Sequence, residues 1–95
     1  MSAVNTTTAL SMVKARLNRL ASDTTLDVYL NTRITAAINE LEATGIILTA
    51  STDDLMLVVD YTVWEYQNRD KLGAMPDWLK LRRRERWIQQ GGGSG

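Results

Sequence analysis

The sequence predicts an all-α protein: a small four-helix domain with short connections and a projecting C-terminal helix. Apolar residues recur at spacings of three and four along most of the chain, a period typical of helices that pack on one side. Residue types that start and end helices separate four such segments. The alternating pattern of a strand is missing except for a short candidate at 46–49. We expect a single helical domain over residues 1–90 and a flexible Gly/Ser tail over 91–95.

The first helix is expected after a frayed, polar stretch at residues 1–7, with Thr7 or Thr8 as its cap. Its apolar stripe consists of Leu10, Val13, Leu17 and Leu20. A polar break follows at 21–25, where Asp23, Thr24 and Thr25 are candidate caps for the second helix.

The second helix begins at Asp27 and carries the most regular stripe of the chain. Its members are Leu26, Leu30, Ile34, Ile38 and Leu41, with Tyr29 and Ala37 beside them. Gly45 stands where a left-handed residue commonly closes a helix. We expect Ile46 and Leu48 to fold back onto that helix end.

The third helix is expected to be capped by Ser51 or Thr52, with two aspartates near its positive end. One apolar face holds Leu55, Met56, Val59, Val63 and Tyr66, and the nearly opposite face holds Leu57, Tyr61 and Trp64. A helix that is apolar nearly all round is buried nearly all round. Because one face suffices to meet the core of so small a domain, the second is predicted to be a subunit interface of Leu57, Tyr61 and Trp64.

Gly73 and Pro76 separate the third helix from the fourth. The fourth helix, at about 76–89, is poorly amphipathic: Trp78, Leu81 and Ile88 align, Glu85 interrupts their stripe, and Trp87 points away. This pattern is weak for a core helix and typical of a docking element.

The composition argues against catalysis and against a metal or cofactor site. The chain contains no His and no Cys, so we expect no enzyme, no metal site and no cofactor. Asp53 and Asp54 are interpreted as helix-capping residues, because adjacent residues of a helix point in different directions. Arg69 is interpreted as a cap on the carbonyls that end the third helix, with a bridge to a neighbouring copy as the alternative. No apolar run approaches the roughly 20 residues of a spanning helix, and no secretion signal is found, so we expect a soluble protein made in the cytoplasm without membrane contact.

The net charge is zero, but the charges are unevenly placed. Residues 46–75 hold five acidic and two basic side chains, whereas 76–95 hold five basic and two acidic ones. These segments are predicted to pair between neighbouring copies. The neutral balance argues against tight nonspecific DNA binding. The basic run at 79–87 is open to three interpretations: a protein interface, a solvent-facing helix side, or a nucleic-acid contact.

Several motifs, in this order, resemble a known family. They are Asp-x-x-Leu at 27–30, Ala-Ala-Ile at 36–38, Thr-Gly-Ile at 44–46, an aromatic residue followed by Asn-Arg at 66–69, and a Pro-led last helix at 75–88. Over roughly residues 8–88 the chain resembles the head–tail connector, or head-completion adaptor, proteins of tailed bacteriophages. The motif at 66–69 has one residue fewer between the aromatic residue and Asn-Arg than the family pattern, and the chain also departs from the family in its high Arg density and Gly-rich end.

The resemblance implies a virion protein at the neck, made in the host cytoplasm. Such proteins form a ring of identical copies beneath the portal protein, extend the channel through which DNA passes without specific binding, and receive a downstream neck or tail protein. The family's last helix is associated with the portal side, which implies a docking role for Trp78, Arg82, Arg83, Arg84, Arg86 and Trp87. The alternative is a small helical DNA-binding regulator that uses the basic last helix.

Overall fold

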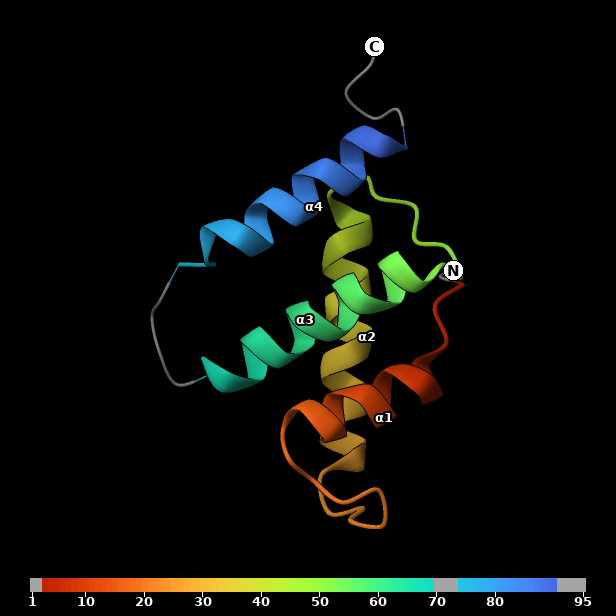
Figure 1. The fold of residues 1–95 in the computed structure, drawn as a ribbon, viewed down its shortest axis with the longest axis vertical. Helices are drawn as coiled ribbons and strands as arrows, with labels where there is room; N and C mark the ends of the chain where they lie inside the picture. The colour runs from red at the N-terminus through yellow and green to blue at the C-terminus, as the bar shows by residue number, and fades with distance from the viewer. Residues whose placement is uncertain (1–2, 70–73, 91–95) are drawn as a thin grey trace.

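The computed structural model describes residues 3–69 and 74–90, and these residues form four α-helices and no strand. The helices are α1 (Thr6–Arg16), α2 (Asp27–Ala43), α3 (Thr52–Gln67) and α4 (Asp77–Gln89). The predicted all-α class is therefore confirmed. In Figure 1, α2 crosses behind α1 and α3, and α4 lies along the side of α3 that faces away from α1.

The core lies where α1, α2 and α3 pack against one another. The stripe predicted for α2 is confirmed there, since Leu30, Ile34, Ile38 and Leu41 are buried and Leu26 packs against them. The strand candidate at 46–49 is wrong: the segment is irregular, and Ile46 and Leu48 are buried against the core as expected. The other buried apolar residues of this core are Val4, Ala9, Val13, Ala37, Leu57, Val58, Val59, Tyr61, Val63 and Leu79.

Helix α1 differs from the expectation at both ends. Asn5 is the cap, and its side chain accepts a hydrogen bond from the amide of Thr8. The predicted fraying of residues 1–7 is wrong for the described part, because Val4 is buried in the core. The helix ends at Arg16, so Leu20 falls in the following turn and is exposed instead of continuing the stripe.

Helix α2 begins without a side-chain cap. Leu26 holds the cap position, and Asp23 instead accepts hydrogen bonds from the amide and hydroxyl of Thr25. Lys14 of α1 fixes the first turn of α2. Its buried ammonium forms an ion pair with Asp27 at 3.0 Å and donates a hydrogen bond to the carbonyl of Ala21 at 3.0 Å. A buried lysine that joins these two helices was not predicted from the residue pattern.

Gly45 closes α2 as predicted. Thr44 is the last cap residue and Gly45 follows it with a φ of +97°, in the left-handed region that glycine adopts without a steric cost. A Cβ atom at this position would stand 2.9 Å from Nε1 of Trp87. The turn therefore needs glycine both for its backbone angle and for the approach of α4.

Replacing Gly45 by Ala is expected to lower the free energy of unfolding by more than about 1 kcal/mol, because the alanine is strained at positive φ and collides with the indole. Thermal unfolding followed by circular dichroism measures the change. Ala43→Gly, two residues earlier and exposed on the helix, is the matched control for a change in glycine content. Equal melting temperatures for wild type and Gly45→Ala would contradict the requirement for glycine at this turn.

Helix α3 is central. Ser51 caps it and accepts a hydrogen bond from the amide of Asp54, as predicted. Eight of its residues are buried, including every position from 57 to 63, so the expectation of burial on both faces is confirmed. At its end Arg69 donates to the carbonyl of Tyr66 at 2.5 Å and lies over that ring, which agrees with the predicted capping role.

Helix α4 starts after Pro76, its cap residue, and packs against α3. Leu79 is its one fully buried side chain. The helix-breaking role expected of Gly73 and the tail expected at 91–95 lie outside the described residues.

Candidate interaction surface

Helix α4 has an inner face that is tied to the rest of the chain mainly by polar contacts. Leu79 fills the apolar contact with the core cluster, and Trp87 packs against the same cluster near Gly45. Arg82 and Arg86, one turn apart on this face, each bind an aspartate of α3. A helix with so little apolar burial depends on these two ion pairs for its position.

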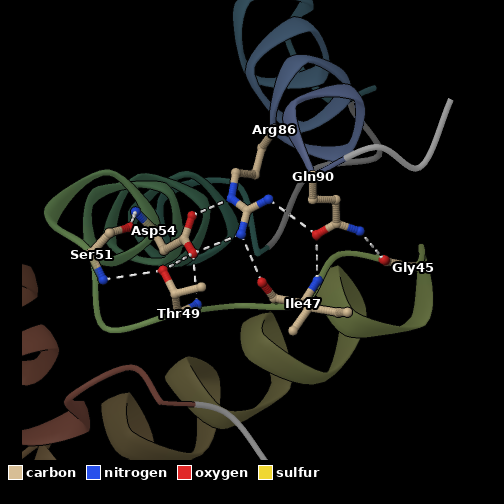
Figure 2. Close-up of polar contacts among 7 residues, drawn as sticks. All are labelled: Gly45, Ile47, Thr49, Ser51, Asp54, Arg86 and Gln90. Atoms are coloured by element: carbon tan, nitrogen blue, oxygen red, sulfur yellow. Dashed lines mark hydrogen bonds and ion pairs between the residues drawn. The ribbon is translucent and has the colours of Figure 1, made fainter. Parts of the chain in front are cut away.

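The stronger pair joins Arg86 to Asp54, and Figure 2 shows it between the end of α4 and the first turn of α3. Nε and Nη2 of Arg86 reach the two carboxylate oxygens at 2.5 and 3.0 Å, a bidentate arrangement. The carboxylate also accepts the amide and hydroxyl of Thr49 at 2.7 and 2.8 Å. Asp54 is thus an acceptor for four donors and leaves almost no surface to solvent.

The same guanidinium also donates a second set of hydrogen bonds. Its Nη2 donates to the carbonyl of Ile47 at 2.7 Å, and its Nη1 donates to the side-chain oxygen of Gln90 at 3.0 Å. Gln90 in turn accepts the amide of Ile47 and donates to the carbonyl of Gly45 (Figure 2). These contacts fix the irregular segment at 45–50 between α2, α3 and α4. We call the set formed by Gly45, Ile47, Thr49, Asp54, Arg86 and Gln90 the α4 latch.

The pKa values at the latch reflect this geometry. Burial by itself raises the pKa of Asp54, but hydrogen bonds from Arg86 and Thr49 outweigh it and hold the pKa below its ordinary value. The hydrogen bond from Asp54 raises the pKa of Arg86 against the opposing effect of burial. Both groups are therefore charged across the physiological range.

Asp60 forms the other ion-pair connection between α3 and α4. It lies on α3 with little exposure, between α1 and α4, and binds Arg16 of α1 at 2.5 Å and Arg82 of α4. The acidic middle and basic end of the sequence thus pair within one chain, through Asp54 and Asp60. The prediction that they pair between copies is wrong for these residues, because α4 folds back across α3.

The predicted subunit interface is also corrected. Leu57 and Tyr61 are only 3% and 5% exposed in the single chain, so no neighbouring copy covers them. Leu57 lies beside Arg82 and Arg86 of α4, and the Tyr61 hydroxyl donates to Glu40 of α2 at 2.6 Å. Burial and this hydrogen bond raise the pKa of Tyr61.

Trp64, the third residue of the predicted interface, is half-buried. It packs against the core and meets the Tyr61 ring edge-on at 6.4 Å. The predicted second face exists, but the chain's own helices cover most of it.

The six residues expected to dock onto a partner divide in the same way. Arg82, Arg86 and Trp87 contact α3 and the core cluster of their own chain, and a docking role for them stays a prediction. Trp78 and Arg84 are exposed and Arg83 is half-exposed. Within the described residues neither Arg83 nor Arg84 takes part in an ion pair. With Thr44 and Trp87, these two arginines line a shallow pocket of about 180 Å³.

The outer face of α4 carries the aligned apolar residues. Trp78, Leu81 and Ile88 are 50%, 56% and 50% exposed, and they fall on one side of the helix, away from Leu79. Their alignment was predicted, and the structure leaves all three uncovered within the chain. We call these three residues the α4 ridge. Exposed large apolar residues gathered on one face, not scattered singly, indicate an interaction site.

A second uncovered surface lies on α2. Its outward side forms a shallow groove of about 530 Å³, lined by Val28, Asn31, Thr32, Thr35, Ala36 and Asn39. No charged residue lines this groove, although it faces away from the core residues of the same helix. The apolar stripe of α2 does not reveal this groove, because the lining residues lie on the opposite side of the helix. The signal in the sequence was an outward helix face of about three turns without a charge. We call it the α2 groove.

A cluster of four polar side chains joins α2 and α3: Arg33, Glu40, Tyr61 and Glu65. Arg33 and Glu65 form an ion pair at 3.3 Å, but Nε of Arg33 and Oε1 of Glu65 are buried without a hydrogen-bond partner. Burial, and secondarily the charge of Glu40, raise the pKa of Glu65 above its ordinary 4.5, while Arg33 acts in the opposite direction. The ionised carboxylate is therefore imperfectly compensated.

This raised pKa has a testable consequence. As the pH rises above 4.5, the unfolded chain loses the Glu65 proton before the folded chain does, so stability falls until the folded carboxyl ionises. Glu65→Gln is expected to remove this fall, so its melting temperature relative to wild type increases from pH 4 to pH 7. Glu85→Gln, an exposed site on α4, is the matched control. If the difference in melting temperature between Glu65→Gln and wild type does not depend on pH, the raised pKa of Glu65 is contradicted.

The described residues hold no group of three or more His, Cys, Asp and Glu side chains placed to bind a metal ion. Over the same ranges, no helix has both the length and the apolar character required to cross a membrane. What the arrangement offers chemically is a pair of uncharged or apolar surfaces, the α4 ridge and the α2 groove, and an arginine pocket.

Comparison of the chain with protein-family models, curated proteins and solved structures found no match.

Proposed function

We propose that this chain is a structural adaptor that assembles into a ring and connects a bacteriophage portal to the tail or neck. The observation that carries the proposal is the α4 ridge, which presents three large apolar side chains to solvent on a helix otherwise held by polar contacts. Such a face has no role in the folded chain and gains stability only when another surface covers it. The family resemblance supplies the identity of the assembly.

The helix boundaries support the same proposal. The motifs of the resemblance coincide with the start of α2, its closing turn at Gly45, the end of α3 and the cap of α4 at Pro76. They therefore mark a consecutive set of elements, in the order that the resemblance implies. The absence of net charge suits a ring whose channel DNA must pass through without binding.

The surfaces of the proposed ring differ from those first expected. Leu57 and Tyr61 belong to the core, so contacts between copies use exposed residues instead. For the portal, Arg83 and Arg84 remain as the docking cations, because their pocket is open and they have no carboxylate partner among the described residues. Acidic side chains of the portal are the matching chemistry.

The central experiment is electron microscopy of the purified protein, alone and mixed with the portal protein encoded in the same genome. A ring of this chain at one end of the portal is the expected result. Separate particles at micromolar concentrations of both proteins would overturn the proposal. Tight, salt-dependent binding to duplex DNA would favour the alternative regulator, although Arg82 and Arg86 are already bound to aspartates and could not reach DNA in this conformation.

Charge reversal of the arginine pocket is expected to weaken portal binding at least about tenfold, because charge-assisted contacts of this kind contribute 1.5–3 kcal/mol each. The double variant Arg83→Glu/Arg84→Glu should retain the helical circular dichroism of wild type, since neither side chain forms an ion pair within the described chain. A pull-down with the portal measures binding. The matched control is Gln67→Glu, which places an acidic side chain at an exposed position at the end of α3. Unchanged capture of the double variant would remove the pocket from the docking surface.

A further inference from the structure

We infer that the α4 ridge of one copy packs into the α2 groove of the next copy, and that this contact builds the ring. The inference deepens the proposed function and depends on it for the closed assembly. It rests on three properties of the two surfaces: their shapes, their charges and their positions on the same protomer.

The shapes are complementary. The ridge presents a Trp, a Leu and an Ile on one side of α4. The groove, apart from Val28 at its start, is lined by small or short side chains, so a neighbouring helix can approach closely. Helices pack by inserting the side-chain ridges of one into the grooves of the other. The lengths also agree, since 13 residues of α4 span roughly 20 Å and 17 residues of α2 roughly 25 Å.

The charges are complementary at the edges. Lys80 is exposed beside the ridge, one residue before Leu81. Glu42 continues the line of the groove, seven residues after Thr35 and thus on the same side of α2. A basic side chain at the border of the ridge therefore faces an acidic end of the groove in one relative orientation of the two helices.

Glu85 lies within the ridge and has to be accommodated. The groove offers amide groups from Asn31 and Asn39 and hydroxyl groups from Thr32 and Thr35, all of which can donate to a carboxylate. The uncharged polar lining of the groove thus suits a ridge that is apolar with a single acidic position, better than a purely apolar lining would.

The two surfaces lie on one protomer but do not meet there. All six lining residues of the groove belong to α2, and the ridge is exposed on the outside of α4. Each copy therefore offers one ridge and one groove to different neighbours. Such a heterologous contact repeats around a closed ring or along an open filament, and it does not stop at a dimer.

One helix laid on another is a small contact compared with the 1,200–2,000 Å² typical of stable interfaces. Weak association of the free chain is therefore expected. A portal that holds several copies side by side raises their effective concentration and favours closure. Assembly should accordingly be far more complete with the portal than without it.

The lack of cysteine makes cross-linking a direct test. Leu81→Cys and Ala36→Cys are introduced in separate chains, mixed on the portal and treated with a short bismaleimide. We expect dimers that contain one chain of each kind, and a ladder of higher multimers from the double variant. Leu81→Cys mixed with Asp53→Cys, an exposed site on α3 outside both surfaces, is the matched control. Equal yields from the two mixtures, or cross-linking of Leu81→Cys mainly to itself, would overturn the inference.

A charge exchange provides a second test. Leu81→Glu and Ala36→Lys alter exposed or half-exposed positions, so each variant should keep the wild-type melting temperature. Each alone should reduce ring assembly at least about tenfold, as expected for a central interface position, and the double variant should recover part of it. Recovery is the sign of direct contact, since a structural defect would not be repaired by a second one. Absence of any recovery, with both variants folded, counts against the contact.

These outcomes separate the inference from the proposed function. Rings on the portal without the predicted cross-link would disprove the ridge-to-groove contact and leave the adaptor role intact. A cross-linked ladder from a chain that never binds the portal would support the contact and disprove the portal adaptor. The loss of both would disprove both.

Discussion

Replacing Arg86 by Met is expected to lower the free energy of unfolding by about 3–5 kcal/mol. The change removes the bidentate partner of Asp54, whose carboxylate is almost fully buried and would keep only the two donors of Thr49. Breaking a buried ion pair by removing one partner costs this much because the remaining charge is left uncompensated. Against the roughly 5–15 kcal/mol of total stability that is typical of folded proteins, the loss is severe.

Denaturant unfolding followed by circular dichroism measures the effect, with the midpoint and the slope compared between variants. Arg84→Met is the matched control: the same change, two residues earlier on the exposed side of α4, should shift stability by less than about 0.5 kcal/mol. The double variant Asp54→Asn/Arg86→Met should be more stable than Arg86→Met alone, because it removes the orphaned charge. Similar midpoints for Arg86→Met and Arg84→Met would show that the latch does not hold α4.

Leu79→Ala is expected to cost about 2–5 kcal/mol, the range for truncating a fully buried leucine. This side chain is the one completely buried residue of α4, so the helix has no other to take its place. The comparison with Leu81→Ala is unusually direct, because the two leucines lie two residues apart on opposite sides of one helix. Leu81→Ala should change stability by no more than about 0.5 kcal/mol and should instead weaken assembly.

Each of the two measurements is therefore expected to respond to a different leucine. Melting temperature reports on Leu79, and ring formation on the portal reports on Leu81. Loss of stability in both variants would mean that the ridge contributes to the fold of the single chain. Loss of neither property in Leu81→Ala would remove the reason to treat the ridge as an interface.

The stability of the latch also predicts an acid limit. The pKa of Asp54 is below its ordinary 3.8, so the latch contributes its full stability above that pH. The contribution is lost as the pH falls through the lowered pKa of the folded state. Melting temperatures of wild type should therefore fall below pH 4, and the fall should be smaller in Asp54→Asn. A fall of equal size in both proteins would assign the acid sensitivity to other carboxylates.

Local features of the chain were predictable because they depend on neighbours in sequence. Gly45 closes α2 at positive φ, Ser51 caps α3, and the stripe of α2 is buried, each as the residue types and spacings indicated. Burial of both faces of α3 also followed from its composition. Caps were wrong where two or three polar residues competed, as at Asn5 and at the start of α2, since the local pattern does not rank them.

The sequence does not show which surface buries each face of α3. Leu57 and Tyr61 need an apolar neighbour, and Asp54 and Asp60 need cations, but a second copy or the chain's own last helix satisfies these needs equally well. The same pattern therefore allowed pairing within the chain and pairing between copies. The tertiary structure decides between them by folding α4 back along α3, which places Arg82 and Arg86 on the two aspartates.

By itself the sequence determined four helices, most of their ends, their buried stripes and the alignment of Trp78, Leu81 and Ile88. Tertiary structure alone decided that these three stay exposed while Leu79 and two arginines turn inward, and that α2 presents an uncharged groove. The physical reason is one of range: helix period and capping are set within about one turn of the chain. The choice of which faces meet depends on contacts between residues 20 to 45 positions apart, whose geometry only the folded chain defines.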